Sequence, residues 1–145
     1  MFQAFSAPTH PVTGDTRLKA LRREMKRHNI DALVVPHADE QRNEYLPPCA
    51  ERLAWLSGFT GSAGEAVVTM NEAVVFVDGR YTLQSAQQTD EDHWTVESLI
   101  ENPTHKWLRK NGQKNARIGF DPWLHTLNEV KNLEAAAEEL NGELV

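Results

Sequence analysis

Two short stretches of the sequence carry residue types that could bind a ligand. The first, GFTGSAG, places three glycines between Gly58 and Gly64, and glycine-rich loops can wrap backbone amides around a phosphate. A phosphate loop follows a strand and precedes a helix, whereas here a helical pattern comes first and a strand-like run follows. The spacing matches neither common phosphate-binding pattern, and no lysine follows. We therefore predict a turn, in which small residues permit positive φ and close backbone packing.

The second stretch, VDGRY, places Asp78, Gly79 and Arg80 where a predicted strand ends and a helix begins. Side chains at such points project from a rigid edge, where α/β domains commonly meet ligands or partners. The planar guanidinium of Arg80 suits a carboxylate or a backbone carbonyl. The alternative is an Asp78–Arg80 ion pair on the surface that caps the next helix. From the residues alone, the ion pair is the favoured interpretation.

The remaining reactive residue types form no recognisable catalytic or metal-binding motif. There is no H-E-x-x-H sequence and no pair of cysteines. Cys49 is the only cysteine, so no internal disulfide can form, and we expect a structural thiol. Asp39, Glu40 and Glu44 share a polar loop, where carboxylates are expected to be solvated. We predict no metal ligand and no catalytic residue in this chain, whose histidines are scattered at His10, His28, His37, His93, His105 and His125.

Composition restricts the class of protein further. A chain of 145 residues with 40% hydrophobic and 25% charged residues is typical of one globular domain. The net charge of -6 argues against a nucleic-acid binder, and we interpret the basic run from Arg17 to Arg27 as a solvated helix face. We find no signal peptide and no run of 18 apolar residues, so we expect a cytoplasmic protein without membrane contact.

The order of predicted elements indicates an α/β fold with a mixed β-sheet and flanking helices. Residues 1–14 read as a loose N-terminal arm, and residues 15–145 as one domain. Asn102 is predicted to cap a helix whose first turn contains Pro103. Thr126 and Glu129 are predicted to form the capping box of a helix with Leu127 on its apolar face. The predicted helices cover residues 15–29, 51–57, 81–89, 103–110 and 127–140, and the strands residues 30–36, 65–70, 73–78, 94–99, 116–121 and 143–145.

Three stretches together resemble a known family. NEYLPPCAERLAWLSGFTGSAGEAVV, VDGRYTLQSAQQ and GFDPWLHT are similar to the N-terminal domain of long-type Xaa-Pro aminopeptidases (aminopeptidase P), which are creatinase/prolidase metallopeptidases. The resemblance implies a ribonuclease-H-like fold. It also implies that catalysis belongs to a C-terminal "pita-bread" domain with two divalent metal ions, usually manganese, and that this domain is absent from the present chain.

The resemblance implies that one residue of this chain binds the substrate. The arginine of the D-G-R-Y motif, here Arg80, reaches the cleft of such enzymes and helps to bind the peptide, with Asp78 and Tyr81 as possible neighbours. The implied partners are the protein's own catalytic domain, a proline-containing peptide and a second copy in a homodimer. A departure occurs near Gln41, where relatives often carry a histidine. The alternative function is a non-catalytic peptide- or protein-binding module of the same family that lacks the metal site.

The absence of a ligand cluster in the sequence leads to a first prediction. A hydrolytic dimetal site needs several carboxylates and imidazoles that converge on the ions. We expect the isolated chain to bind no manganese tightly and to hydrolyse no Xaa-Pro peptide. Isothermal calorimetry with manganese tests this, and a stoichiometric site of micromolar affinity or tighter would contradict it.

Overall fold

The computed structural model describes residues 11–145, with side chains from residue 15 onward. Helix α1 (Pro11–Arg27) begins four residues before the predicted start, because a proline is compatible with the first turn of a helix. Residues 1–10 of the predicted arm lie outside the described part. Within that part, no helix is both long enough and apolar enough to cross a membrane.

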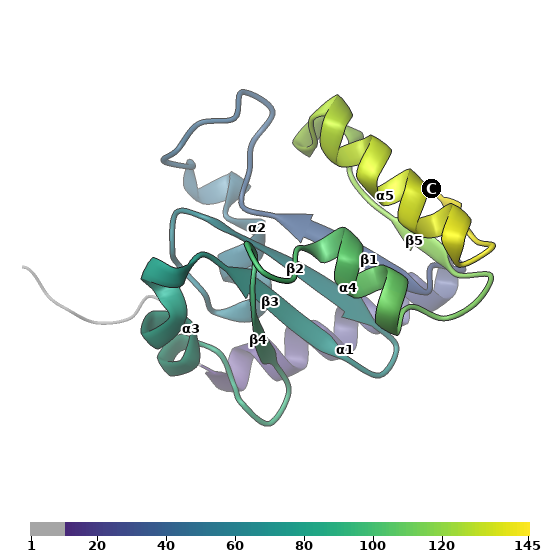
Figure 1. The fold of residues 1–145 in the computed structure, drawn as a ribbon. Coiled ribbons are helices and arrows are strands. Elements are labelled where there is room, and N and C mark those ends of the chain that lie inside the picture. The colour runs from purple at the N-terminus through teal and green to yellow at the C-terminus, as the bar shows by residue number, and fades with distance from the viewer. Residues whose placement is uncertain (1–10) are drawn as a thin grey trace, which may run out of the picture.

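The centre of the fold is a mixed six-stranded sheet in the order β4-β3-β2-β1-β5-β6 (Figure 1). Strands β2 and β3 form an antiparallel hairpin, and β1 is antiparallel to β2. The other three pairings are parallel. Every strand begins and ends within two residues of its predicted position. The strands are β1 (Ala32–Pro36), β2 (Gly64–Thr69), β3 (Ala73–Val77), β4 (Thr95–Ser98), β5 (Arg117–Gly119) and β6 (Glu143–Leu144).

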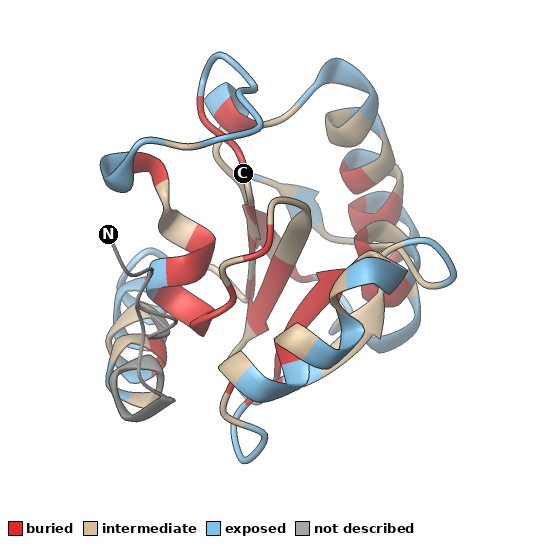
Figure 2. Cartoon of the chain, turned by 90° about the vertical axis from the view of Figure 1, so that its left-hand side faces the viewer, coloured by how far each residue is buried: buried red, intermediate tan, exposed pale blue. Residues whose placement is uncertain are grey.

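Two helical layers cover the two faces of this sheet, so the predicted α/β fold is confirmed (Figure 2). One layer is α1 and α2 (Arg52–Ser57), and the other is α4 (Thr104–Asn111) and α5 (Leu127–Glu139). Helix α3 (Thr82–Gln88) follows β3 at one end of the sheet. Three short 3₁₀ helices complete the described part of the chain, η1 (Pro48–Ala50), η2 (Gly79–Tyr81) and η3 (Pro122–Leu124).

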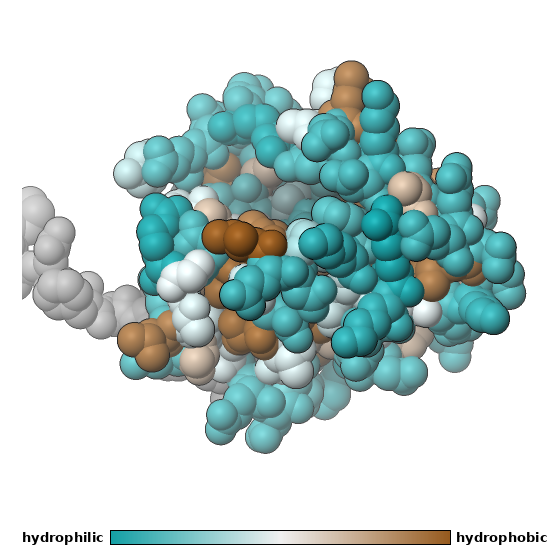
Figure 3. All heavy atoms as spheres, in the orientation of Figure 1, coloured by the Kyte–Doolittle hydropathy of each residue, from teal (hydrophilic) through white to brown (hydrophobic). Residues whose placement is uncertain are grey.

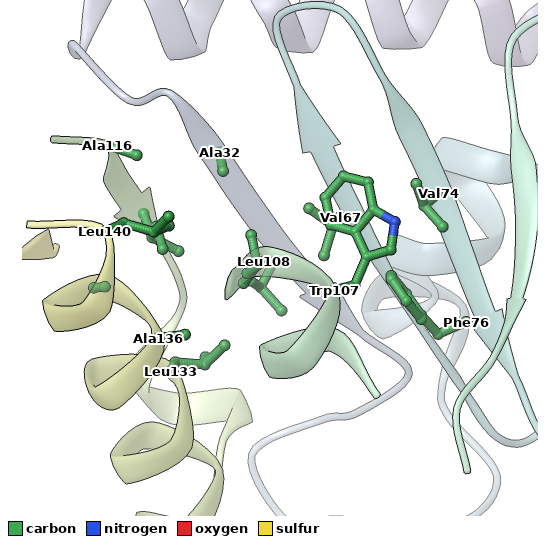
Figure 4. Packing of buried hydrophobic residues seen from close by; sticks show 13 residues of the cluster. Ala32, Val67, Val74, Phe76, Trp107, Leu108, Ala116, Leu133, Ala136 and Leu140 are labelled. Atoms are coloured by element: carbon green, nitrogen blue, oxygen red, sulfur yellow. The ribbon is translucent and has the colours of Figure 1, made fainter. Parts of the chain in front are cut away.

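Alternate residues of the central strands belong to two hydrophobic cores, one on each face of the sheet. In β3, Val74 and Phe76 face the α4–α5 side, whereas Val75 and Val77 face the α1–α2 side. Figure 4 shows the first of these cores, in which Trp107 of α4 packs over the sheet with its ring edge-to-face on Phe76 at 6.1 Å. Because both faces are buried, the strands read as continuous apolar runs rather than as alternating ones.

Two details of the helices differ from the sequence predictions. The cap of α4 is Pro103 and not Asn102, whose side chain donates to Glu97 instead. The capping box of Thr126 and Glu129 is confirmed, but Leu127 is 82% exposed because it lies in the first turn and points away from the sheet. The apolar face of α5 therefore begins later, at residues Leu133, Ala136, Ala137 and Leu140.

The glycine-rich stretch is a turn between α2 and β2, as predicted, but positive φ is used only at Gly58, where φ is 87°. At Gly61 and Gly64 a side chain is excluded for a different reason, namely the buried ring of Phe59. A Cβ on Gly61 would overlap three atoms of that ring. One on Gly64 would lie 2.9 Å from the ring and 3.2 Å from the Phe76 carbonyl oxygen.

This packing predicts the effect of adding side chains to the turn. Gly61→Val and Gly64→Val should each destabilise the domain by about 1–3 kcal/mol or more, because Phe59 has no free space into which to move. Gly79→Val is the matched control, since a Cβ there meets no atom within 4 Å. Urea unfolding of the three variants measures the difference. Equal stabilities for all three would show that the turn does not depend on this close packing.

Candidate functional site

Five strands end at the same edge of the sheet. β1 and β3 both run antiparallel to β2, β4 is parallel to β3, and β5 and β6 are parallel to β1. The segments that follow β1, β3, β4 and β5 are residues 37–47, η2, residues 99–103 and η3. We call this the strand-end edge. In α/β folds, ligands bind outside the carboxyl ends of the strands, so this edge is where function is expected.

Arg80 lies at the strand-end edge in a fixed orientation. Asp78 begins η2 by accepting a hydrogen bond of 2.9 Å from the backbone N–H of Arg80. The same carboxylate accepts from Nε of Arg80 at 3.0 Å and from Nη2 at 2.7 Å. These bonds hold the pKa of Asp78 below its usual value. The arginine side chain nevertheless remains 71% exposed, so it is held from one side and open on the other.

Tyr81 supports this arginine from below. The guanidinium carbon of Arg80 lies 5.3 Å from the centre of the Tyr81 ring, a cation–π distance. The ring itself packs edge-to-face on Phe59 at 5.7 Å, and its hydroxyl is 2.6 Å from that of Ser62. The structure thus brings together the three residues singled out in the sequence and links them to the glycine-rich turn. The surface ion pair that the residues alone favoured is present as well, so the two interpretations of Arg80 are compatible.

Three backbone amides of the glycine-rich turn are already engaged. The N–H groups of Gly58, Phe59 and Thr60 donate to the Ala54 carbonyl, the Ser57 hydroxyl and the Gln88 side chain, respectively. Gln88 in turn donates to the Thr60 hydroxyl at 2.8 Å. The turn is therefore fastened to α3, and these three amides are not available to cradle an anion.

The loop after β1 is organised by a residue that we expected to be solvated. Asp39 is only 2% exposed, and that expectation was wrong. Its carboxylate accepts from the Asn43 side chain at 2.8 Å and from the backbone N–H groups of Asn43 and Gln41. These bonds, first of all those from Asn43, lower the pKa of Asp39. Asp39 thus shapes the loop from inside, a role that its polar neighbours in the sequence conceal.

The same loop is joined to α5 by an arginine. Arg42 makes two hydrogen bonds to the Glu129 carboxylate, at 2.9 and 3.2 Å, and a third to the Leu124 carbonyl at 2.9 Å. Arg42 itself has a φ of 60°, which the surrounding contacts maintain. Sequence reasoning missed this residue, because its partner is 87 positions away.

A cavity of about 430 Å³ opens between this loop, α4 and α5. Glu65, at the start of β2, contributes a carboxylate to its lining. One oxygen of this carboxylate accepts from the Thr104 hydroxyl at the start of α4, and the other faces Nε2 of His125 at 3.7 Å. The network ties β2, α4 and the segment after β5 together at the strand-end edge.

The surroundings of His125 favour its protonated form. Its side chain has no exposed surface, and Nδ1 lies 2.8 Å from the Asp121 carbonyl oxygen, which can only accept. A neutral ring would therefore present a bare Nε2 to the Glu65 carboxylate. Burial alone would lower the pKa of His125, but the interactions with Glu65 and with Asp121 outweigh it and raise that pKa.

The other candidates from the sequence are not assembled into a site. Among residues 11–145 there is no group of three or more His, Cys, Asp or Glu side chains that could hold a metal ion. Cys49 is exposed, a position that does not fit the structural thiol that we expected. The basic face of α1 is partly structural, because Arg17 donates to the Trp55 carbonyl and Arg22 to the Thr69 carbonyl.

The fold and this edge define an α/β domain that presents a fixed arginine but has no metal-binding cluster in its described part. The family model described as "Creatinase/Prolidase N-terminal domain" matches residues 17–145. The chain belongs to this family. The resemblance inferred from the sequence is thereby confirmed.

Curated relatives carry the names of aminopeptidases. A "Probable Xaa-Pro aminopeptidase P" of Coccidioides posadasii is 38% identical over 143 residues, which are 97% of this chain and 22% of that protein. Human "Xaa-Pro aminopeptidase 2" is 37% identical over 139 residues, which are 95% of this chain and 20% of that protein. The chain therefore corresponds to about a fifth of the length of these relatives, namely their N-terminal part.

Two solved structures share the fold of this chain. The X-prolyl aminopeptidase of Caenorhabditis elegans, described as a cytosolic enzyme with a di-nuclear active site, superposes with a TM-score of 0.84 at 28% identity. The match covers 92% of this chain and 24% of that one. The N-terminal domain of a metallopeptidase from Corynebacterium diphtheriae, at 24% identity and a TM-score of 0.68, shares the fold over 91% of this chain and 94% of its own.

The His125–Glu65 pair predicts how stability depends on pH. Because the folded-state pKa of His125 is raised, the pair contributes fully below the unfolded value of about 6.5, and its contribution is lost as pH rises through the higher folded value. The free energy of unfolding of the wild type, relative to that of His125→Gln, should therefore fall with rising pH.

The comparison uses urea unfolding at a series of pH values. Taking the difference between the two proteins removes other titrations, including that of His105, whose pKa is lowered by burial and by the nearby Arg109 and Lys106. His28→Gln, at an exposed position, is the control and should keep the wild-type profile. A difference that is flat or rises with pH would rule out an imidazolium at His125.

Proposed function

We propose that this chain is the non-catalytic N-terminal domain of a dimetal Xaa-Pro aminopeptidase, an enzyme that removes the N-terminal residue preceding a proline. In this proposal the strand-end edge helps to cover the active-site cleft, and Arg80 binds the substrate peptide. The support comes from family membership, from relatives named as Xaa-Pro aminopeptidases, and from the geometry around Arg80.

The observation that carries the proposal is that Arg80 is both fixed and exposed. An arginine serving only a surface ion pair needs no further support, and such pairs contribute little to stability. Here Asp78 occupies Nε and Nη2, Tyr81 lies beneath the guanidinium, and Ser62 holds Tyr81. The outer side of a preorganised guanidinium remains free for a peptide carbonyl or carboxylate.

The proposal also includes features that lie outside the described residues. The two metal ions, which we propose to be manganese, belong to a separate catalytic domain with which this domain associates. We further propose a cytoplasmic homodimer as the whole protein. The description of the Caenorhabditis elegans relative as cytosolic, with a di-nuclear active site, supports the location and the metal count.

Arg80→Ala in the full-length protein tests the proposal. A lost charge-assisted hydrogen bond at the cleft should lower kcat/KM for an Xaa-Pro peptide by one to three orders of magnitude, or roughly 1.4–4 kcal/mol. Arg80→Lys should restore little, because a point charge cannot reproduce the planar fork held by Asp78. Steady-state kinetics measure both effects.

The control is Arg23→Ala, which removes an exposed arginine from α1 and should leave kcat/KM near that of the wild type. Melting temperature and metal content should be unchanged in all three variants, since the Arg80 side chain is 71% exposed and surface ion pairs contribute little to stability. Activity of Arg80→Ala within twofold of the wild type would show that Arg80 forms only a surface ion pair with Asp78 and does not bind the substrate.

A further inference from the structure

The cavity between α4, α5 and the loop after β1 has no role in the function proposed above. Its volume of about 430 Å³ lies within the range of ligand pockets, about 300–1,000 Å³. Figure 3 shows the surrounding face as largely hydrophilic, with hydrophobic residues scattered over it. We infer that this cavity binds an extended peptide segment, continuing from the part of the peptide held at Arg80. This inference rests on the proposed function, because Arg80 marks where the peptide enters.

The cavity and Arg80 are connected through two side chains. Ser62 lines the cavity, and its hydroxyl lies 2.6 Å from that of Tyr81. The ring of Tyr81 in turn lies under the Arg80 guanidinium. In the proposed arrangement, a peptide held at Arg80 continues past Tyr81 and Ser62 into the cavity.

The charges in the cavity wall compensate one another. Arg42 is paired with Glu129, and Glu65 faces Nε2 of His125, whose pKa is raised. A phosphate would meet two carboxylates, and a divalent cation would meet Arg42. A lining that is polar but without excess charge instead suits uncharged hydrogen-bonding groups, and the peptide backbone is such a ligand.

Two side chains of the lining have no hydrogen-bond partner among the described residues. His105 comes from the first turn of α4, and Asn132 from the second turn of α5, so they reach the cavity from two different helices. The lowered pKa of His105 keeps its ring neutral at pH 7, with one N–H donor and one nitrogen acceptor. The Asn132 amide likewise both donates and accepts. Together they match the alternating N–H and C=O groups of an extended chain.

The test compares two probe peptides, the tripeptide Ala-Pro-Ala and the heptapeptide Ala-Pro-Ala-Ala-Ala-Ala-Ala, on the isotope-labelled chain by NMR titration. In the proposed arrangement, only the longer peptide extends from Arg80 into the cavity. It should bind at least about tenfold more tightly than the tripeptide, and it should shift the signals of His105 and Asn132. In His105→Ala and Asn132→Ala, the heptapeptide should bind at most about threefold more tightly than the tripeptide.

The matched control is Asn128→Ala, which removes the same amide from an exposed position one turn earlier in α5 and should keep the full gain. Arg80→Ala separates the two proposals, since it should weaken the binding of both peptides and leave the ratio of their affinities unchanged. If Arg80→Ala binds both peptides as tightly as the wild type does, and still binds the heptapeptide more tightly than the tripeptide, only the role of Arg80 is rejected. The cavity proposal is overturned if the heptapeptide does not bind, if it binds no more tightly than the tripeptide, or if Asn132→Ala keeps the gain.

Discussion

The three central strands are apolar on both faces, and the rest of the structure follows from the need to cover them. Residues such as Val67, Val74 and Val75 have at most 1% of their surface exposed, so helices must pack on each side of the sheet. Burial of this kind is the main favourable contribution to folding. It also removes both faces of the sheet from function, and leaves the ends of the strands as the place where polar side chains can gather.

Most polar residues at the strand-end edge serve the architecture. Asp39 shapes one loop, Arg42 fastens that loop to α5, and Glu65 joins His125 to α4. Buried polar groups are expensive unless they are satisfied, and each of these carboxylates receives at least one hydrogen bond. Arg80 differs, because the bonds to Asp78 leave most of the arginine side chain exposed. A rigid, exposed cation in a satisfied surrounding is the arrangement expected of a ligand-binding group.

Much of the fold could be predicted from the sequence because the signals are local. Continuous apolar runs marked the strands, Gly58 marked the end of α2, and the Thr126–Glu129 spacing marked the start of α5. The motif around Asp78 and Arg80 was also readable, since a residue and its cap lie two positions apart. These features depend on neighbours in the chain, so the sequence by itself determined the fold class, the family and the candidate arginine.

The tertiary structure decided what depends on distant partners. The sequence could not show that Asp39 is buried, that Arg42 meets Glu129 across 87 positions, or that His125 faces Glu65. It also suggested positive φ for glycines whose real constraint is the ring of Phe59. In each case the environment of the side chain is created by packing of separate elements, which no local pattern encodes. The cavity lined by Ser62 and Glu65 arises in the same way, from the approach of α4, α5 and the loop after β1.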